Sequence, residues 1–436
     1  MKKLVFFMIL STQIVVGFGQ TAVQGIINSN VTFTKNKSPY LVTGDLVVFP
    51  NWKLTIEPGV ELRFADDVTL QIRGTLVALG TETDSISFVS NTGTSQGLWQ
   101  GIKVMSTLGG NASFNYCNFS HASTAVDDEC CVGGIEEIRN SHFTFNIEAI
   151  GVPIGKPVYL KIENCYFANN ESSIVGGFKM INHCIFENNE YGLKAGMVYV
   201  SNSTFTNHSQ AALYGGNGEL TNCIITGNNI GVKGCDGGFT IEKCDISNNQ
   251  VGIELDDYLY DSGRYVSPVN NSTICNNIQY NVKNNSICDV ELYTNCWCTS
   301  DSTEVENLIY DAWDNYNVGF VNYTLFVDDC SQPILRTFKA ENRVEYYPYP
   351  TGIRNLTNNE NLIYPNPAYS TLFIRNTEKL TNIRIYDLTG MLLMDRFGFD
   401  EELIELNVSE FRPGIYIVRL TNQKNEIEFK KILIAR

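Results

Sequence analysis

The segment NCYFANN at residues 164–170 recurs along the middle of the chain at intervals of about 20 residues. It returns as NHCIFENN at 182–189 and as NSTFTNH at 202–208, and further copies contain Cys223 and Cys244. Each copy is too small to bury its own apolar face, so the copies must stack. Stacking of one strand on the next at about 4.8 Å predicts a parallel β-helix. Its core anchors are spaced 19 to 21 residues apart: Phe167, Phe186, Phe205, Ile225 and Ile246.

Asparagine stands two residues after most of these anchors, at the point where the chain must turn. Asn tolerates the left-handed backbone conformation that such a bend needs. Stacked Asn amides also hydrogen-bond from coil to coil, and each bond contributes on the order of 1 kcal/mol. We therefore expect coil-stacking roles for Asn169, Asn188, Asn207 and Asn248. His121 and His208 fall at the same kind of position and are expected to be turn residues rather than catalytic bases.

The composition agrees with a β-rich chain and excludes some partners. The 436 residues carry a net charge of −16, with a pI near 4.8 and no basic cluster, so nucleic acid and anionic lipid surfaces are poor partners. Charged residues make up 18% and hydrophobic residues 43%, which excludes a disordered protein.

The flanks of the repeat resemble a known architecture. SPYLVTGDLVVFPNWKLTIEPGVELRF at 38–64, LQIRGTLVALGT at 70–81 and WQGIKV at 99–104 resemble the first coils of right-handed parallel β-helix proteins of the pectate-lyase-like group. Residues 289–326 resemble the last coil of that group, with Cys298 where a glycine usually stands, so the local turn is expected to differ. The resemblance implies the fold and is nearly silent on activity.

The N-terminus has the features of an export signal. Lys2 and Lys3 precede a short apolar stretch at residues 4–16, and Gly17-Phe18-Gly19 supplies a small-residue cleavage site. The apolar stretch is too short for a membrane anchor, and no later segment is long enough to span a bilayer. We expect residues 1–19 to be a signal peptide.

The C-terminus reads as a separate small domain. Six or seven short alternating strands in residues 361–436 predict a small immunoglobulin-like β-sandwich. IYPNPAYSTLFI, IRIYDLTGMLL, LNVSEFRPGIYIVRL and FKKILIAR in this region resemble the type A C-terminal sorting domain of the type IX secretion system of Bacteroidetes. The resemblance implies recognition by the type IX translocon. The secretion-signal residues it points to are Tyr364, Pro365, Asn366, Pro367, Gly390, Pro413, Gly414 and Tyr416.

The 13 cysteines fall into two groups. Cys165, Cys184, Cys223 and Cys244 share one repeat position, which Ser203 also occupies, and this favours small buried thiols over a disulfide ladder. Export makes disulfides plausible elsewhere, most easily between the last coil and its flank. CWC at 296–298 lacks the second pair and the histidine of a convincing zinc site, so no metal site is predicted at these cysteines.

The strongest polar signal is an insertion between the last repeats. Ile246 and the next anchor, Ile274, are 28 residues apart, so a loop must extend from the coil there. Its acidic residues are candidates to hold Ca²⁺, its tyrosines to stack on sugar rings, and its arginine to face a uronate. The candidate catalytic residues are Asp256, Asp257 and Arg264, and the candidate substrate-binding residues are Tyr258, Tyr260 and Tyr265. A second insertion, residues 126–134, contains Asp127, Asp128 and Glu129 and is interpreted in the same way.

These observations predict an all-β chain with four parts. They are a signal peptide (1–19), a right-handed parallel β-helix (20–330, with an N-terminal cap at about 21–50), a linker (331–360) and the sorting domain (361–436). Two functions remain open for this secreted or cell-surface protein. One is a non-catalytic scaffold that adheres or binds polysaccharide or a host or cell-surface glycan. The alternative is a polysaccharide lyase or glycoside hydrolase that acts on acidic polysaccharide, and fold analogy alone is a weak warrant for it.

Overall fold

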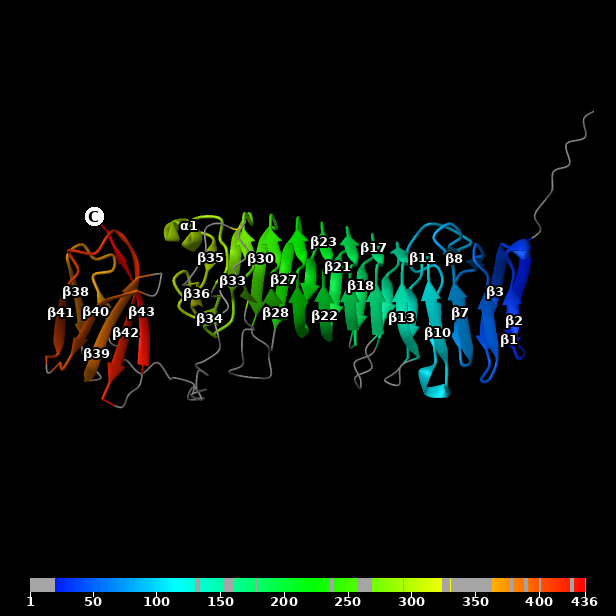
Figure 1. Cartoon of the computed structure of the whole chain (residues 1–436), viewed down its shortest axis with the longest axis horizontal. Coiled ribbons are helices and arrows are strands. Elements are labelled where there is room, and N and C mark those ends of the chain that lie inside the picture. The colour runs from blue at the N-terminus through cyan, green and yellow to red at the C-terminus, as the bar shows by residue number, and fades with distance from the viewer. Residues whose placement is uncertain are drawn as a thin grey trace, which may run out of the picture.

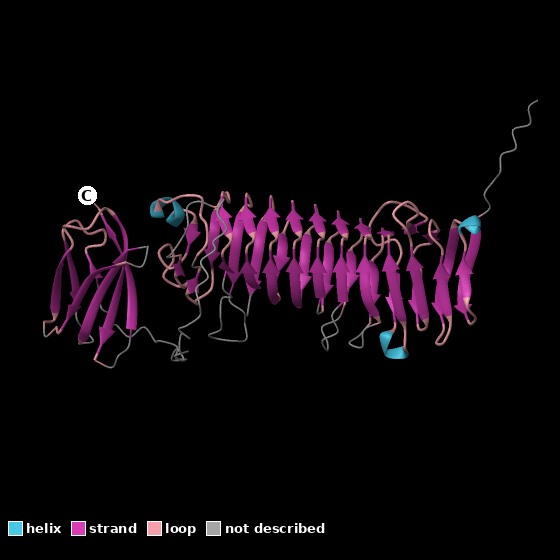
Figure 2. Cartoon of the chain, viewed as in Figure 1, coloured by secondary structure: helices cyan, strands magenta, loops and turns pink. Residues whose placement is uncertain are grey.

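The structure is a computed structural model of the chain. It describes the following residues: 20–129, 134–152, 160–177, 179–235, 239–256, 269–292, 294–323, 330, 363–375, 379–387, 391–399, 401–423 and 427–435. Figure 1 shows a long stack of strands followed by a smaller group of strands that contains the C-terminus. Strands dominate both parts, and Figure 2 shows only short helical turns.

The stack is a parallel β-helix with three strands in each regular coil, which form three faces. Sheet 1 has 11 strands. They are β2 (Val31–Phe33), β4 (Lys53–Ile56), β7 (Thr75–Leu79), β10 (Asn111–Asn115), β13 (Ile135–Arg139), β16 (Leu160–Glu163), β19 (Lys179–Asn182), β22 (Met197–Ser201), β25 (Asn217–Thr221), β28 (Phe239–Glu242) and β31 (Val269–Asn270).

Sheet 2 carries the repeat motif. Its strands are β5 (Glu61–Phe64), β8 (Ile86–Ser90), β11 (Cys117–Ser120), β14 (His142–Thr144), β17 (Tyr166–Ala168), β20 (Ile185–Glu187), β23 (Thr204–Thr206), β26 (Ile224–Thr226), β29 (Asp245–Ser247) and β32 (Thr273–Cys275).

Sheet 3 completes each coil. Its strands are β6 (Thr69–Ile72), β9 (Gly101–Val104), β12 (Thr124–Asp128), β15 (Glu148–Gly151), β18 (Ser172–Gly176), β21 (Tyr191–Ala195), β24 (Ala211–Tyr214), β27 (Ile230–Cys235), β30 (Val251–Asp256), β33 (Tyr280–Asn284) and β35 (Ile309–Tyr310). The long strand β3 (Tyr40–Val48) pairs with β1 (Thr21–Ile27) on one side and with both β5 and β6 on the other, so sheets 2 and 3 start from one strand.

The anchors of the repeat form one continuous column in the core. The rings of Phe88, Phe119, Phe143, Phe167, Phe186 and Phe205 stack with centroid distances of 4.5 to 5.0 Å between neighbours. Ile225, Ile246 and Ile274 continue the same column in register. All of these side chains are buried. The column is the direct product of the 19- to 31-residue spacing in the sequence, because each coil places its anchor above the previous one.

Two neighbouring asparagine positions in each coil have different roles. Asn169, Asn188, Asn207 and Asn248 take positive φ values of 54 to 58° and make the turn. The coil-to-coil amide ladder, which we expected of the same residues, lies one position later because the turn directs that next side chain inward. Its buried members are Asn146, Asn170, Asn189, His208, Asn228, Asn249 and Asn277.

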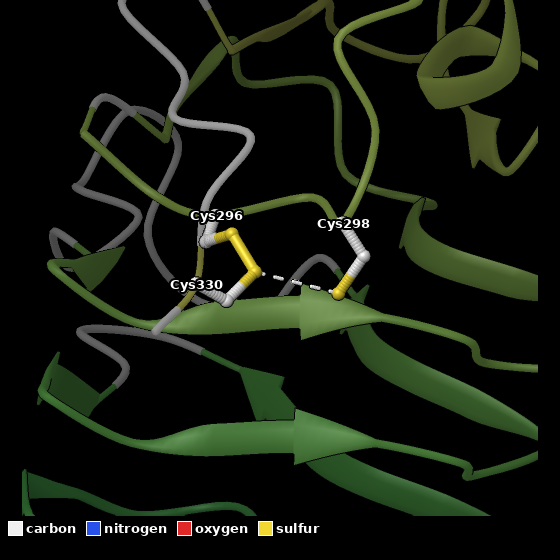
Figure 3. Close-up of side chains that lie close together, drawn as sticks. All are labelled: Cys296, Cys298 and Cys330. Carbon is white, nitrogen blue, oxygen red and sulfur yellow. Dashed lines mark hydrogen bonds between the residues drawn. A yellow bond between two sulfur atoms is a disulfide. The ribbon is translucent and has the colours of Figure 1, made fainter. Parts of the chain in front are cut away.

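The last coil is closed by short elements and by disulfides. β34 (Val290–Glu291) pairs with β36 (Val321–Asn322), and α1 (Ser302–Glu306) lies between them in sequence. Cys298 has φ 60°, the left-handed geometry that a glycine would adopt there. Disulfides join Cys275 to Cys298 and Cys296 to Cys330. Figure 3 shows how closely the sulfurs of Cys296, Cys298 and Cys330 gather. The disulfides connect the last coil with its flank, as the export signal led us to expect.

Two antiparallel sheets form the C-terminal domain. One contains β37 (Ile363–Tyr364), β38 (Thr371–Arg375) and β41 (Leu403–Asn407), and the other runs β40 (Leu392–Phe397), β39 (Leu380–Asp387), β42 (Gly414–Asn422), β43 (Ile427–Ile434). Both contribute to one apolar core that includes Ile374, Ile385, Leu406, Val418 and Ile432. The predicted fold class, a parallel β-helix followed by a small β-sandwich, is confirmed.

Candidate functional site

The insertion singled out in the sequence begins at the end of a strand of sheet 3. Asp256 is the last residue of β30, not part of the loop, and its side chain is half-exposed. The other candidates, Asp257, Tyr258, Tyr260, Arg264 and Tyr265, lie outside the described residues. The site is therefore built from Asp256 and from the outward face of sheet 3 on which it lies.

One outward row crosses six consecutive strands of this sheet. Register pairing places the members directly above one another in the order Lys194, Tyr214, Lys233, Glu254, Lys283 and Tyr310. Neighbours along the row are about 4.8 Å apart, because that is the spacing of paired strands. We call this row, with the flanking residues Tyr191, Tyr280 and Asp256, the tyrosine–lysine face.

The charged side chains in the middle of the row form ion pairs with one another. The Lys233 ammonium lies 2.6 Å from Glu254 and 3.0 Å from Asp256, and the Lys283 ammonium lies 3.6 Å from Glu254. Burial disfavours the charged form of Lys233, but hydrogen bonds and attraction from Glu254 and Asp256 outweigh it and raise the lysine pKa. Asn285 also donates a hydrogen bond to Asp256 at 2.9 Å. The arrangement fixes the lysine side chains on the surface in a defined geometry.

Tyrosine rings lie at both ends of the charged segment. The Lys194 ammonium sits 4.0 Å from the centroid of the Tyr191 ring, and Tyr191 meets Tyr214 edge to face at 5.3 Å. Tyr280 and Tyr310 meet in the same manner at 5.7 Å. In the described part of the chain, Lys194 has no carboxylate partner, in contrast to Lys233 and Lys283. Aromatic surfaces beside a cation and hydrogen-bonding groups are suited to a ligand with apolar faces and polar edges.

A pair of carboxylates lies further along the same face. Asp127 of β12 is in register with Lys103 and Gly151, and Glu148 of β15 is in register with Thr124. A Cβ added to Gly151 would lie 3.4 Å from a Glu148 oxygen and 3.6 Å from an Asp127 oxygen, so both carboxylates border one small space. Burial raises the pKa of Asp127, Lys103 opposes the rise, and Asp128, Glu148 and Glu129 add to it.

The expectation that Asp127 and Asp128 belong to a loop is wrong. Both lie in β12, and neighbouring strand residues point to opposite faces. Asp127 therefore faces outward, while Asp128 is buried and accepts backbone hydrogen bonds from Gly134 and Ile135. The two carboxylates do not form a dyad.

Metal-binding groups are scarce in the described part of the chain. The group of closely spaced ligand atoms found there is Cys296, Cys298 and Cys330, whose sulfurs belong to disulfides. Glu254 and Asp256 form ion pairs with lysines, and the remaining acidic residues of the predicted Ca²⁺ loop lie outside the described residues.

No helix in the described part is both long and apolar enough to cross a membrane.

The predicted secretion-signal residues have clear positions in the sandwich. Tyr364 belongs to β37 and stacks on Phe373, and the Tyr416 hydroxyl donates a hydrogen bond to the Arg412 carbonyl. The Asn366 side chain bonds to the backbone of β43, accepting from Leu433 at 2.7 Å. Pro365 and Pro367 follow β37, Pro413 precedes β42, and Gly414 is the first residue of β42. Gly390 lies outside the described residues.

Sequence reasoning missed the tyrosine–lysine face, although a positional signal exists. The outward residue stands eight or nine positions after each anchor, as in Phe186 to Lys194 and Phe205 to Tyr214. The residue type changes from coil to coil, so a search for repeated letters does not find it.

Comparison with known proteins identifies the C-terminal domain. Residues 362–435 match the family described as the secretion system C-terminal sorting domain. The chain thus combines a parallel β-helix with a sorting domain that indicates export by type IX secretion. The protein bark beetle of Drosophila melanogaster is 41% identical over 70 residues, which is 16% of this chain and 2% of that protein.

The comparison with solved structures also gives a match. It is the tailspike protein gp49 of the Acinetobacter baumannii bacteriophage Fri1, a capsular polysaccharide depolymerase. The match has a TM-score of 0.35 and 12% identity, and it covers 96% of this chain and 80% of that chain.

Proposed function

We propose that this is an exported glycan-binding protein that presents the tyrosine–lysine face to a polysaccharide, at the cell surface or after release. The observation that carries the proposal is the single register row from Lys194 to Tyr310, in which rings and paired charges follow one another. The row runs along the solenoid axis, so one extended polymer can contact several coils at once. Many weak contacts in a fixed array give avidity without a deep pocket.

The experiment uses the mature chain, residues 20–436, with and without Ca²⁺, on immobilised pectic, alginate-like and glycosaminoglycan polymers. We expect retention on at least one polymer and a loss of about tenfold or more in affinity on Tyr214→Ala or Lys194→Met, because a few aromatic and cationic contacts dominate such surfaces. Tyr199→Ala is the matched control, because Tyr199 is 38% exposed on sheet 1 and Tyr214 is 42% exposed on sheet 3. Equal losses in the three variants, or no retention on any polymer, would contradict the proposal.

Cleavage of the bound polymer is a second candidate function, supported by Asp127 and Glu148. A glycosidase needs one protonated and one ionised carboxyl group on either side of the scissile bond. The raised pKa of Asp127 suits the acid, and Glu148 across the space beside Gly151 suits the base or nucleophile. New reducing or unsaturated ends on a retained polymer, lost in Asp127→Asn, would establish this activity. Retention without new ends would leave binding alone.

A further inference from the structure

The two edge strands of the larger sheet in the sorting domain differ in how far other residues cover them. The edge strand β43 is covered by residues 366–368 of the same chain. The Asn366 amide donates to the Lys431 carbonyl and accepts from the Leu433 N–H, while Ala368 exchanges backbone bonds with Leu433 and Ala435. Residues 366–368 therefore cover the C-terminal half of this edge, residues 431–435, and hinder the addition of another strand there.

The opposite edge strand, β40, is open. It pairs with β39 on one side and is the last strand of the sheet on the other. Gly398 donates its N–H to Thr381 of β39, so alternation directs the backbone groups of Asp395 and Phe397 away from β39. Within the described part of the domain, no further strand pairs with this side of β40.

Several apolar side chains are exposed along this edge. Met391, Leu392 and Leu393 are exposed, and Phe397 is 66% exposed, with the Arg384 guanidinium over its ring. The strand also carries Asp395 and Arg396, and Asp395 pairs with Arg384 of β39 at 3.0 Å. Natural sheets protect their edges with charges, bulges or covering segments, so an uncovered edge with this many exposed apolar side chains indicates a strand-pairing surface.

We propose that β40 is the surface by which the export machinery reads the sorting domain. Its occupant is an extended segment of a secretion-system protein that adds to the sheet as a fifth strand and offers apolar side chains to Leu392 and Phe397. Backbone pairing of this kind supplies affinity, and alternate side chains supply specificity. The proposal rests on the sorting role of residues 362–435. The occupant of the β40 edge is a strand because another backbone best satisfies the unpaired backbone donors and acceptors of this edge.

The test follows export of the full-length chain from a bacterium that has a type IX system. Phe397→Pro removes an outward N–H and blocks strand addition without removing a bond to β39. We expect at least about tenfold less chain on the surface and in the medium. The purified variant should keep the thermal unfolding of the parent. Leu392→Lys should act in the same direction. Phe397→Ile keeps the N–H and an apolar side chain and should be exported like the parent.

Phe429→Lys is the matched control, because Phe429 is 56% exposed on β43, the opposite edge strand of the same sheet. It should be exported normally. Parental export of Phe397→Pro would overturn the proposal, as would equal losses in Phe429→Lys. A dimer of the purified parent that Phe397→Pro dissociates would make the occupant a second copy and overturn the assignment to the machinery. Failure of the parent chain itself to be exported would overturn the sorting role and this proposal with it.

Discussion

His208 replaces an asparagine in the buried amide ladder, and the replacement leaves one polar group without a partner. Its Nδ1 lies 3.2 Å from the Asn189 nitrogen and 3.3 Å from the Asn189 oxygen, so it accepts from the N–H or donates to the carbonyl according to the tautomer. In either tautomer Nε2 is buried and makes no hydrogen bond. Burial also lowers the pKa of His208 to about 4 from 6.5, while the Asn189 carbonyl opposes the shift. An unsatisfied buried donor or acceptor costs about 1–3 kcal/mol.

We therefore expect His208→Asn to raise the free energy of unfolding by about 1–2 kcal/mol at pH 7. Between pH 6.5 and 4 the unfolded chain binds a proton that the folded parent does not, so parental stability falls as the pH is lowered through that window. The variant should lose this part of the pH dependence. Urea unfolding at pH 7 and pH 5 measures both effects. His183→Asn, at an exposed turn, is the control and should change neither.

Lys179 is a second titratable residue whose side chain is buried in the core. The side chain is fully buried, and its ammonium donates to the Val175 and Gly176 carbonyls at the corner between sheets 3 and 1. Burial lowers the pKa of Lys179 to about 7 from 10.5. Between these values the unfolded state binds more protons, so stability should rise with pH from 7 toward 10.

Lys179→Met should flatten that rise and stabilise the fold at pH 7 by roughly 1–3 kcal/mol, because no charge then has to be buried. Thermal unfolding at pH 7 and pH 9.5 tests the expectation, with Lys161→Met on the exposed side of the neighbouring strand as the control. A variant that is less stable than the parent at both values would show that the two carbonyl bonds outweigh the burial cost.

At the scale of the element, the segment that covers β43 should matter more for the sandwich than its exposure suggests. Asn366 is exposed, yet its amide makes both backbone bonds to the edge. Asn366→Ala should lower the stability of the C-terminal domain by about 1 kcal/mol, since each such bond contributes 0.5–1.5 kcal/mol. It should also increase self-association, because a second edge opens. Calorimetry and light scattering check the two effects, and Asn317→Ala in the last coil should leave both unchanged.

The sequence determines some elements better than others, for a physical reason. The Phe column was predictable because each anchor contacts its own kind in the next coil, which keeps the residue type constant from Phe167 to Phe205. The inward asparagine of each pair, such as Asn170 after Asn169, was not predictable. The positive φ at Asn169 reverses which of the two side chains faces the core. The outward row of sheet 3 faces solvent or ligand, and nothing in the fold requires Lys194, Tyr214 and Lys233 to be alike. The residues proposed to bind a ligand therefore vary from coil to coil, and the repeat pattern in the sequence does not reveal them.

At the scale of the whole molecule, a stacked solenoid depends on its ends. Within the solenoid each coil contacts only its neighbours, so stability is nearly a sum over coils and unfolding starts at an end of the stack, where a coil has one solenoid neighbour. The last coil has one further contact, with the C-terminal domain, in which Lys431 pairs with Glu306. The column of Phe rings ends at Phe205, and the later coils carry smaller Ile anchors. The disulfides Cys275–Cys298 and Cys296–Cys330 lie at this end, with the Cys298 and Cys330 sulfurs 3.4 Å apart.

Reduction of these disulfides should therefore unfold the molecule from its last coil. Closing a chain segment of 34 residues stabilises a fold by about 3–4 kcal/mol. We expect hydrogen exchange to accelerate first in β33 and β35 after treatment with a thiol, while β11 and β14 keep their protection. The buried Cys117 should not react with an alkylating reagent under the same conditions, because burial raises its pKa to about 12. The double variant Cys296→Ser, Cys330→Ser should show part of the acceleration without any thiol, and uniform acceleration along the stack would instead mean that the coils unfold as one unit.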